Sequence, residues 1–151
     1  MMGSALGGVG YAEEQFGIFL KEGIERVEPT LALNVFVGAA SCNVAIEFGL
    51  QGPNSTNGMS CASGTMGVGD AFRLIRDDYA DVMLGGGVEA PLMPLCFAAF
   101  TIIRAMSARN NDPEHSARPF DKGRDGFVMG EGGAVLVLEE YERARARGAH
   151  I

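Results

Sequence analysis

A single cysteine stands where the sequence changes from a polar, glycine-containing segment to a small, apolar one. Cys61 follows residues 52–60 and precedes Ala62–Gly64. This change predicts that an extended segment turns into a helix at the cysteine, which would place the sulfur at the positive end of the helix dipole. Because such a position favours the thiolate, Cys61 is a possible nucleophile even without an adjacent base. Its backbone N–H is also placed to donate to a thioester oxygen, as half of an oxyanion hole.

The same cysteine has a simpler interpretation as a small buried hydrophobe, which is a frequent fate of an unpaired thiol. Cys42 and Cys96 have only apolar company in the sequence, and we interpret both as core residues. Three cysteines at wide spacings indicate neither a disulfide framework nor a zinc site. We therefore expect a reducing, cytoplasmic setting and no metal ion.

Composition excludes several classes of function. The chain has 151 residues, 47% of them hydrophobic, and a formal charge of −7, so nucleic acid and anionic membranes are poor partners. Its apolar stretches are interrupted too often for a signal peptide or a membrane span. Neither a dinucleotide fingerprint nor a P-loop is spelled anywhere, and we expect no cofactor.

Hydrophobic periodicity predicts the elements that must position Cys61. We expect a helix over 31–50 buried on most sides, and a helix over 62–78 that starts inside the protein and ends in water. We expect a strand over 82–84 that ends in a triple-glycine turn, and a strand over 133–138 covered on both faces. The remaining predicted elements are helices over 11–22, 92–103 and 139–148. Such alternation indicates an α/β fold in one domain or one piece of a domain. We expect the long loop over 104–130 to be functional.

Two stretches in the same order make a family resemblance specific. The segment around Cys61–Gly64 resembles the active-site cysteine segment of the β-ketoacyl-acyl-carrier-protein synthases, and Arg118–Gly132 resembles their most recognisable loop. Ala80–Glu89 and Glu139–Glu142 match as well, so the likeness covers essentially residues 1–151. It is closest to the chain-elongating type II enzymes of fatty acid synthesis.

The resemblance implies a thiolase-like layered α/β fold, normally found in a homodimer, of which residues 1–151 would form part of the N-terminal domain. It implies that Cys61 takes an acyl chain from acyl carrier protein, and that a carbanion from malonyl-carrier protein then attacks the new thioester. Leu6 and Phe100 fall where residues lining the acyl pocket occur. Their alternative interpretation is plain core packing.

The resemblance also implies groups that this sequence does not contain in matching motifs, namely two histidines and a second oxyanion donor. His115 and His150 stand outside any such motif, and we interpret both as solvated. We therefore expect acylation of Cys61 but not condensation by these 151 residues alone. The alternative function is a catalytically incomplete piece that only pairs with other synthase segments, and its uncovered apolar faces predict association.

Overall fold

All 151 residues are described by a computed structural model, in which the chain forms two compact units. Residues 1–89 and 132–151 make up the first unit, and residues 90–131 make up the second. The first unit contains the sheet and Cys61, and the second contains the long loop. No helix in either unit has the length and apolar character that crossing a bilayer requires.

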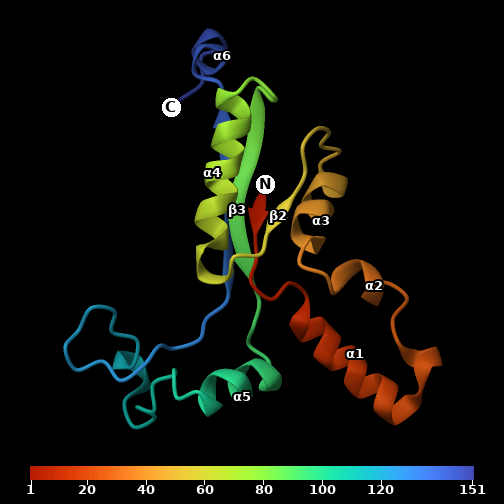
Figure 1. The fold of residues 1–151 in the computed structure, drawn as a ribbon, viewed down its shortest axis with the longest axis vertical. Coiled ribbons are helices and arrows are strands. Elements are labelled where there is room, and N and C mark those ends of the chain that lie inside the picture. The colour runs from red at the N-terminus through yellow and green to blue at the C-terminus, as the bar shows by residue number, and fades with distance from the viewer. The chain divides into compact units, whose positions relative to one another are not determined.

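The first unit is built on a mixed sheet with the order β2-β1-β3-β4 (Figure 1). The strands are β1 (Met2–Gly3), β2 (Thr56–Asn57), β3 (Val82–Glu89) and β4 (Gly132–Glu139). β1 is parallel to β2 and β3, whereas β4 is antiparallel to β3. Three strands therefore end at the same edge of the sheet, and the chain leaves that edge through residues that follow Gly3, Asn57 and Glu89.

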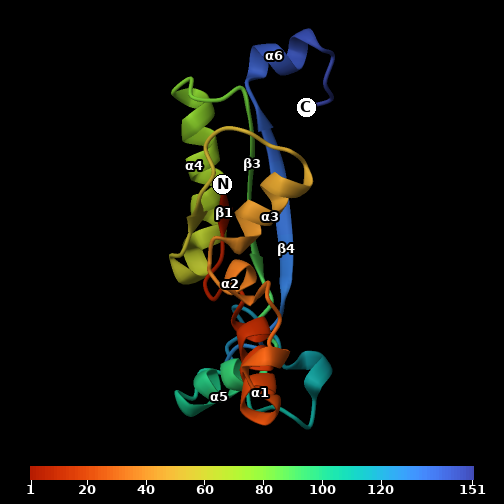
Figure 2. The ribbon, with the colours of Figure 1, turned by 90° about the vertical axis from the view of Figure 1, so that its right-hand side faces the viewer.

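Helix α4 (Ser63–Arg76) runs along β3 in both views (Figures 1 and 2) and packs against β1 and β3. The two backbones approach closely because glycines face each other across the contact. A Cβ atom at Gly87 would lie 2.8 Å from the Cα of Gly64, and one at Gly67 would lie 2.8 Å from the carbonyl oxygen of Gly86. The predicted glycine turn after residue 84 is therefore wrong, since β3 continues through all three glycines to let the helix approach.

The burial of α4 also differs from the prediction. Its buried residues are Ser63, Gly67 and Ala71, which form one stripe at every fourth position along the helix. The other positions are half-buried or exposed from the first turn to the last. The helix thus lies flat on the sheet instead of starting inside the protein and ending in water.

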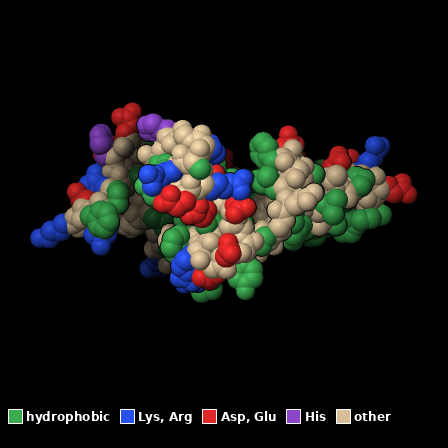
Figure 3. Space-filling model, turned by 90° about the horizontal axis from the view of Figure 1, so that it is seen from above, with side chains coloured by type: hydrophobic (Ala, Val, Ile, Leu, Met, Phe, Trp, Pro, Cys, Tyr) green, Lys and Arg blue, Asp and Glu red, His purple; other side chains and the backbone are tan.

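Strand β4 forms where a strand was predicted, but it is not covered on both faces. It is an edge strand, and Val135, Leu136 and Val137 are 45%, 56% and 69% exposed. No large side chain of the chain is fully buried, and apolar side chains lie among charged ones on the surface (Figure 3). The exposed apolar surface agrees with the expectation that this chain associates.

The helix predicted over 31–50 is interrupted. α2 covers Leu31–Asn34 and α3 covers Ala39–Glu47, and each helix exposes a large apolar side chain, Leu33 by 67% and Ile46 by 78%. Between the two helices the backbone passes against the turn that follows β1, where Gly8 donates its N–H to the carbonyl of Val35 at 3.2 Å. The carbonyl of Val35 therefore bonds Gly8 instead of an N–H group of a continuing helix. α1 (Val9–Glu22) confirms the helix predicted over 11–22, and a short 3-10 turn, η1 (Ile24–Arg26), follows it.

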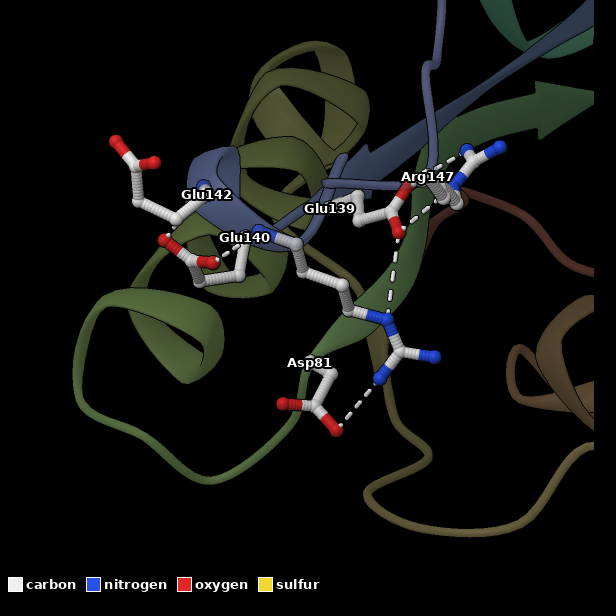
Figure 4. A network of polar contacts seen from close by, with 6 residues as sticks. Asp81, Glu139, Glu140, Glu142 and Arg147 are labelled. Atoms are coloured by element: carbon white, nitrogen blue, oxygen red, sulfur yellow. Dashed lines mark hydrogen bonds and ion pairs between the residues drawn. The ribbon is translucent and has the colours of Figure 1, made fainter. Parts of the chain in front are cut away.

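A group of charged side chains ties the far end of the sheet to the C-terminal helix α6 (Tyr141–Ala146), as Figure 4 shows. Arg147 donates to Glu139 at 2.6 Å, and this contact holds the pKa of Glu139 below its ordinary value and that of Arg147 above it. Glu140 caps α6 by accepting the N–H groups of Glu142 and Arg143. The predicted acidic start and basic end of this helix are confirmed, over a shorter range than 139–148.

The second unit contains α5 (Pro94–Ile102), a 3-10 turn, η3 (Pro113–His115), and an irregular loop. α5 confirms the helix predicted over 92–103. A single parallel bridge joins Met106 to Phe127, and Ser107 and Asp125 fasten the same two segments. The hydroxyl of Ser107 donates to Asp125 at 2.7 Å, which holds the pKa of Asp125 below its ordinary value. The region predicted to be loop is therefore a loop with fixed internal hydrogen bonds.

Candidate functional site

Cys61 lies at the beginning of a helix, as its sequence context predicts. It sits in the middle of a 3-10 turn, η2 (Ser60–Ala62), which leads directly into α4, and its side chain is exposed. Ser60, immediately before it, has a φ of 48°, a conformation that is uncommon for a residue other than glycine. The chain thus turns sharply from β2 into α4 with the thiol at the corner. The role of Cys61 as a nucleophile stays a prediction.

The connection between β2 and Cys61 is held by backbone and side-chain hydrogen bonds. Asn57, the last residue of β2, accepts the N–H of Met59 on its side-chain oxygen at 2.9 Å. Ser60 and Ala62 donate their N–H groups to Gly58 and Met59 at 2.8 and 3.1 Å. The turn that presents the thiol is therefore defined locally, within a few residues of the strand end.

Leu6, one of the two predicted pocket residues, is close to the same strand edge. It belongs to the turn Ser4–Gly7 that follows β1, and its side chain is half-buried. Ser4 donates its backbone N–H to the carbonyl of Asn57 at 3.1 Å, so the turn that carries Leu6 is bonded to the strand that leads to Cys61. The structure therefore brings the segments of Cys61 and Leu6 together at one edge, where open α/β sheets commonly bind ligands.

The turn Ser4–Gly7 is fastened by one carboxylate from the end of β3. Glu89 accepts the hydroxyl of Ser4 at 3.1 Å and the backbone N–H groups of Ala5 and Leu6 at 2.5 and 3.2 Å. The Ser4 hydroxyl oxygen in turn accepts the N–H of Gly7 at 3.0 Å. Sequence reasoning assigned no role to Glu89. The available signal was an isolated acidic residue at the end of the glycine-rich strand.

Phe100, the second predicted pocket residue, belongs to the other compact unit. It is half-buried on α5, and its ring meets that of Phe127 edge to face at 5.3 Å. Within this unit the contact is an ordinary aromatic pair. A lining role for Phe100 stays a prediction.

The remaining cysteines and both histidines lie largely as predicted. Cys96 is buried and confirms its interpretation as core, whereas Cys42 is only half-buried. His115 and His150 are exposed, which confirms that both are solvated. His115 pairs with Asp112 at 2.8 Å. Nowhere do three or more His, Cys, Asp or Glu side chains gather in an arrangement that would hold a metal ion.

The loop of the second unit lines an open cavity of about 810 Å³. Arg118, Lys122 and Arg124 contribute its basic side chains, and Phe127 is among its apolar ones. The guanidinium groups of Arg118 and Arg124 donate to backbone carbonyls of the same loop. These two hydrogen bonds help to hold the shape of the loop.

Comparison with known proteins decides the family. Residues 1–144 match the model of the β-ketoacyl synthase N-terminal domain. The chain belongs to the β-ketoacyl synthase family. The 3-oxoacyl-[acyl-carrier-protein] synthase 2 of Synechocystis sp. is 47% identical to this chain over 151 residues, which span 36% of that relative's length.

Solved ketosynthases share the fold of this chain. A β-ketoacyl synthase from Burkholderia phymatum superposes with a TM-score of 0.83 at 38% identity, over 99% of this chain and 36% of its own. A type II polyketide ketosynthase solved with its acyl-carrier protein superposes with a TM-score of 0.85 at 31% identity, over 99% and 38% of the two chains. The expected thiolase-like α/β fold is thus confirmed for the part that this chain spans.

Proposed function

We propose that this chain carries the acyl-accepting part of a β-ketoacyl-acyl-carrier-protein synthase, with Cys61 as the nucleophile. The observation that carries the proposal is an exposed thiol at the corner between β2 and α4, in a chain that matches the family model over residues 1–144. The backbone amides at the start of α4 support it, because they favour the thiolate and the oxyanion that forms when it attacks.

The first step is a thioester exchange. The Cys61 thiolate attacks the carbonyl carbon of an acyl thioester, and the tetrahedral intermediate collapses by expelling the carrier's thiolate, which takes up a proton. In the second step, for which residues outside these 151 are required, a malonyl thioester loses carbon dioxide and the resulting carbanion attacks the acyl group on Cys61. A carbon–carbon bond forms, the C–S bond to Cys61 breaks, and the thiolate returns to its starting state.

The proposal extends to partners and setting. Acyl carrier protein is the proposed donor, supported by the related ketosynthase that was solved with its carrier protein. We propose that residues 1–151 act as part of an N-terminal synthase domain that pairs with a second copy or with other synthase segments, supported by its exposed apolar side chains. Three free cysteines support a cytoplasmic setting.

Peptide mapping of acylated protein tests the first step. We would incubate the chain with an acyl-carrier protein or acyl-coenzyme A thioester and measure the acyl group on Cys42, Cys61 and Cys96 by mass spectrometry. Since Cys61 is the most exposed of the three, each acylation rate is divided by the rate of alkylation with iodoacetamide at the same residue. This ratio is expected to be highest at Cys61.

A matched control moves the thiol by one residue. The double variant Cys61→Ala, Ala62→Cys keeps an exposed cysteine in the same turn, because Ala62 is also exposed. It is expected to be alkylated but not acylated. Equal ratios at all three cysteines, or full acylation of the shifted thiol, would refute the role of Cys61 as the nucleophile. The alternative function would then remain, in which the chain only pairs with other synthase segments.

A further inference from the structure

Glu89 is a carboxylate whose hydrogen bonds come only from neutral donors that are far away in the sequence. All its hydrogen bonds come from the turn Ser4–Gly7, from one hydroxyl and two successive backbone N–H groups, and these partners lie 83 to 85 residues away in the sequence. Successive backbone N–H groups form a concave site for an anion. Here the anion is supplied by the protein itself, from the end of the neighbouring strand.

The turn Ser4–Gly7 is restrained from two sides. Ser4 is only 3% exposed, and its hydroxyl links the carboxylate of Glu89 to the N–H of Gly7. Gly7 has a φ of +58°, and a Cβ there would lie 2.8 Å from the Cα of Val37. The backbone of Leu6, in the middle of this turn, is therefore set by one carboxylate on one side and by residues 35–37 on the other.

The same turn is coupled to the segment of the nucleophile. Ser4 bonds Asn57, and Asn57 bonds Met59, which immediately precedes the turn of Cys61. A change at Glu89 therefore acts directly on the backbone of Leu6, whereas no hydrogen bond joins Glu89 to residues 59–62. This order of contacts separates an effect on the acyl chain from an effect on the thiol.

We propose that Glu89 is a positioning residue for acyl-chain selection: its carboxylate fixes the turn that presents Leu6 to the acyl chain bound on Cys61. The inference rests on the proposed function and on the acyl-pocket role of Leu6 that the family resemblance implies. Neutralising the carboxylate while keeping its shape leaves an amide NH₂ facing an N–H donor, so one of the three hydrogen bonds must break. Selection between long and short acyl chains then weakens, while the thiol keeps its reactivity.

The test uses the 151-residue chain with Glu89→Gln and measures acylation of Cys61 by short and long acyl thioesters. The preference between long and short acyl chains, measured as the ratio of the two rates, is expected to weaken about tenfold. This factor is equivalent to the loss of one hydrogen bond to a charged group. Alkylation of Cys61 by iodoacetamide, which has no acyl chain, is expected at the wild-type rate. Glu89→Asp keeps the charge but lacks the reach, and should behave like Glu89→Gln.

Glu140→Gln is the matched control, since Glu140 also accepts two backbone N–H groups but caps α6 at the opposite end of the sheet. Its ratio should equal that of the wild type. A wild-type ratio in Glu89→Gln overturns the inference, and so does an equal fall in every acylation rate and in alkylation, which would mark Glu89 as merely structural. If no acyl chain of any length transfers to the wild-type chain, the proposed function itself fails.

Discussion

The close packing of α4 on the sheet at glycine residues allows a quantitative prediction about stability. A Cβ atom at Gly67 would lie 2.8 Å from the carbonyl oxygen of Gly86 and 3.0 Å from the carbonyl carbon of Met2. Both neighbours are backbone atoms, which cannot rotate away, so Gly67→Ala must push the helix off the sheet. Gly69→Ala in the same helix is the matched control, because a Cβ there meets nothing within 4 Å.

The magnitude follows from the difference between the two variants. Each gains about 1 kcal/mol of helix propensity, and this gain cancels in the comparison. What remains is the overpacking at Gly67, about 1–3 kcal/mol. We expect Gly69→Ala to unfold at a higher temperature than the parent, and Gly67→Ala to unfold below Gly69→Ala by roughly 2–4 °C for each kcal/mol.

Thermal unfolding followed by circular dichroism measures this difference, and alkylation of Cys61 reports its consequence for the site. Because η2 leads directly into α4, displacement of the helix should change the alkylation rate in Gly67→Ala and leave it unchanged in Gly69→Ala. Equal melting temperatures for the two variants would refute the close approach of α4 to the sheet.

Three further predictions concern other parts of the chain. Asp125, whose pKa is lowered by the hydroxyl of Ser107, stabilises its loop above its unfolded pKa and loses that effect as pH falls through its folded pKa. Relative to cleavage of an unfolded peptide by pepsin at the same pH, cleavage of the loop should therefore speed up as pH drops below about 4, and Asp125→Asn should remove this additional pH dependence. Val137→Lys on the exposed edge strand should shift gel filtration toward smaller species, and an unchanged profile would exclude β4 from the associating surface. Arg147→Ala should raise the pKa of Glu139 toward its ordinary value, as measured by NMR titration of that carboxyl group.

Much of the fold could be predicted from sequence, because long helices carry their own periodicity. α1, α4, α5 and α6 appear close to the predicted ranges, and β4 appears where its apolar run indicates. β1 and β2 were missed because two residues are too short to show a period. The burial of β4 was predicted wrongly. An apolar run indicates that a strand can be buried on both faces, but it does not identify which segments would bury it.

In the candidate site, the features built by local contacts could be predicted from sequence, and those built by long-range contacts could not. The position of Cys61 at a helix beginning could be predicted, because the turn that presents it is built by hydrogen bonds among residues 57–62. Glu89 could not be predicted to hold the turn of Leu6, because its partners are more than 80 residues away and come together only when β1 and β3 pair. Selectivity for the acyl chain should therefore depend on the pairing of the sheet, whereas the presentation of the thiol depends on one turn. Variants that weaken the pairing of β1 with β3 should lose selection between acyl chains before Cys61 loses its accessibility to a small alkylating reagent.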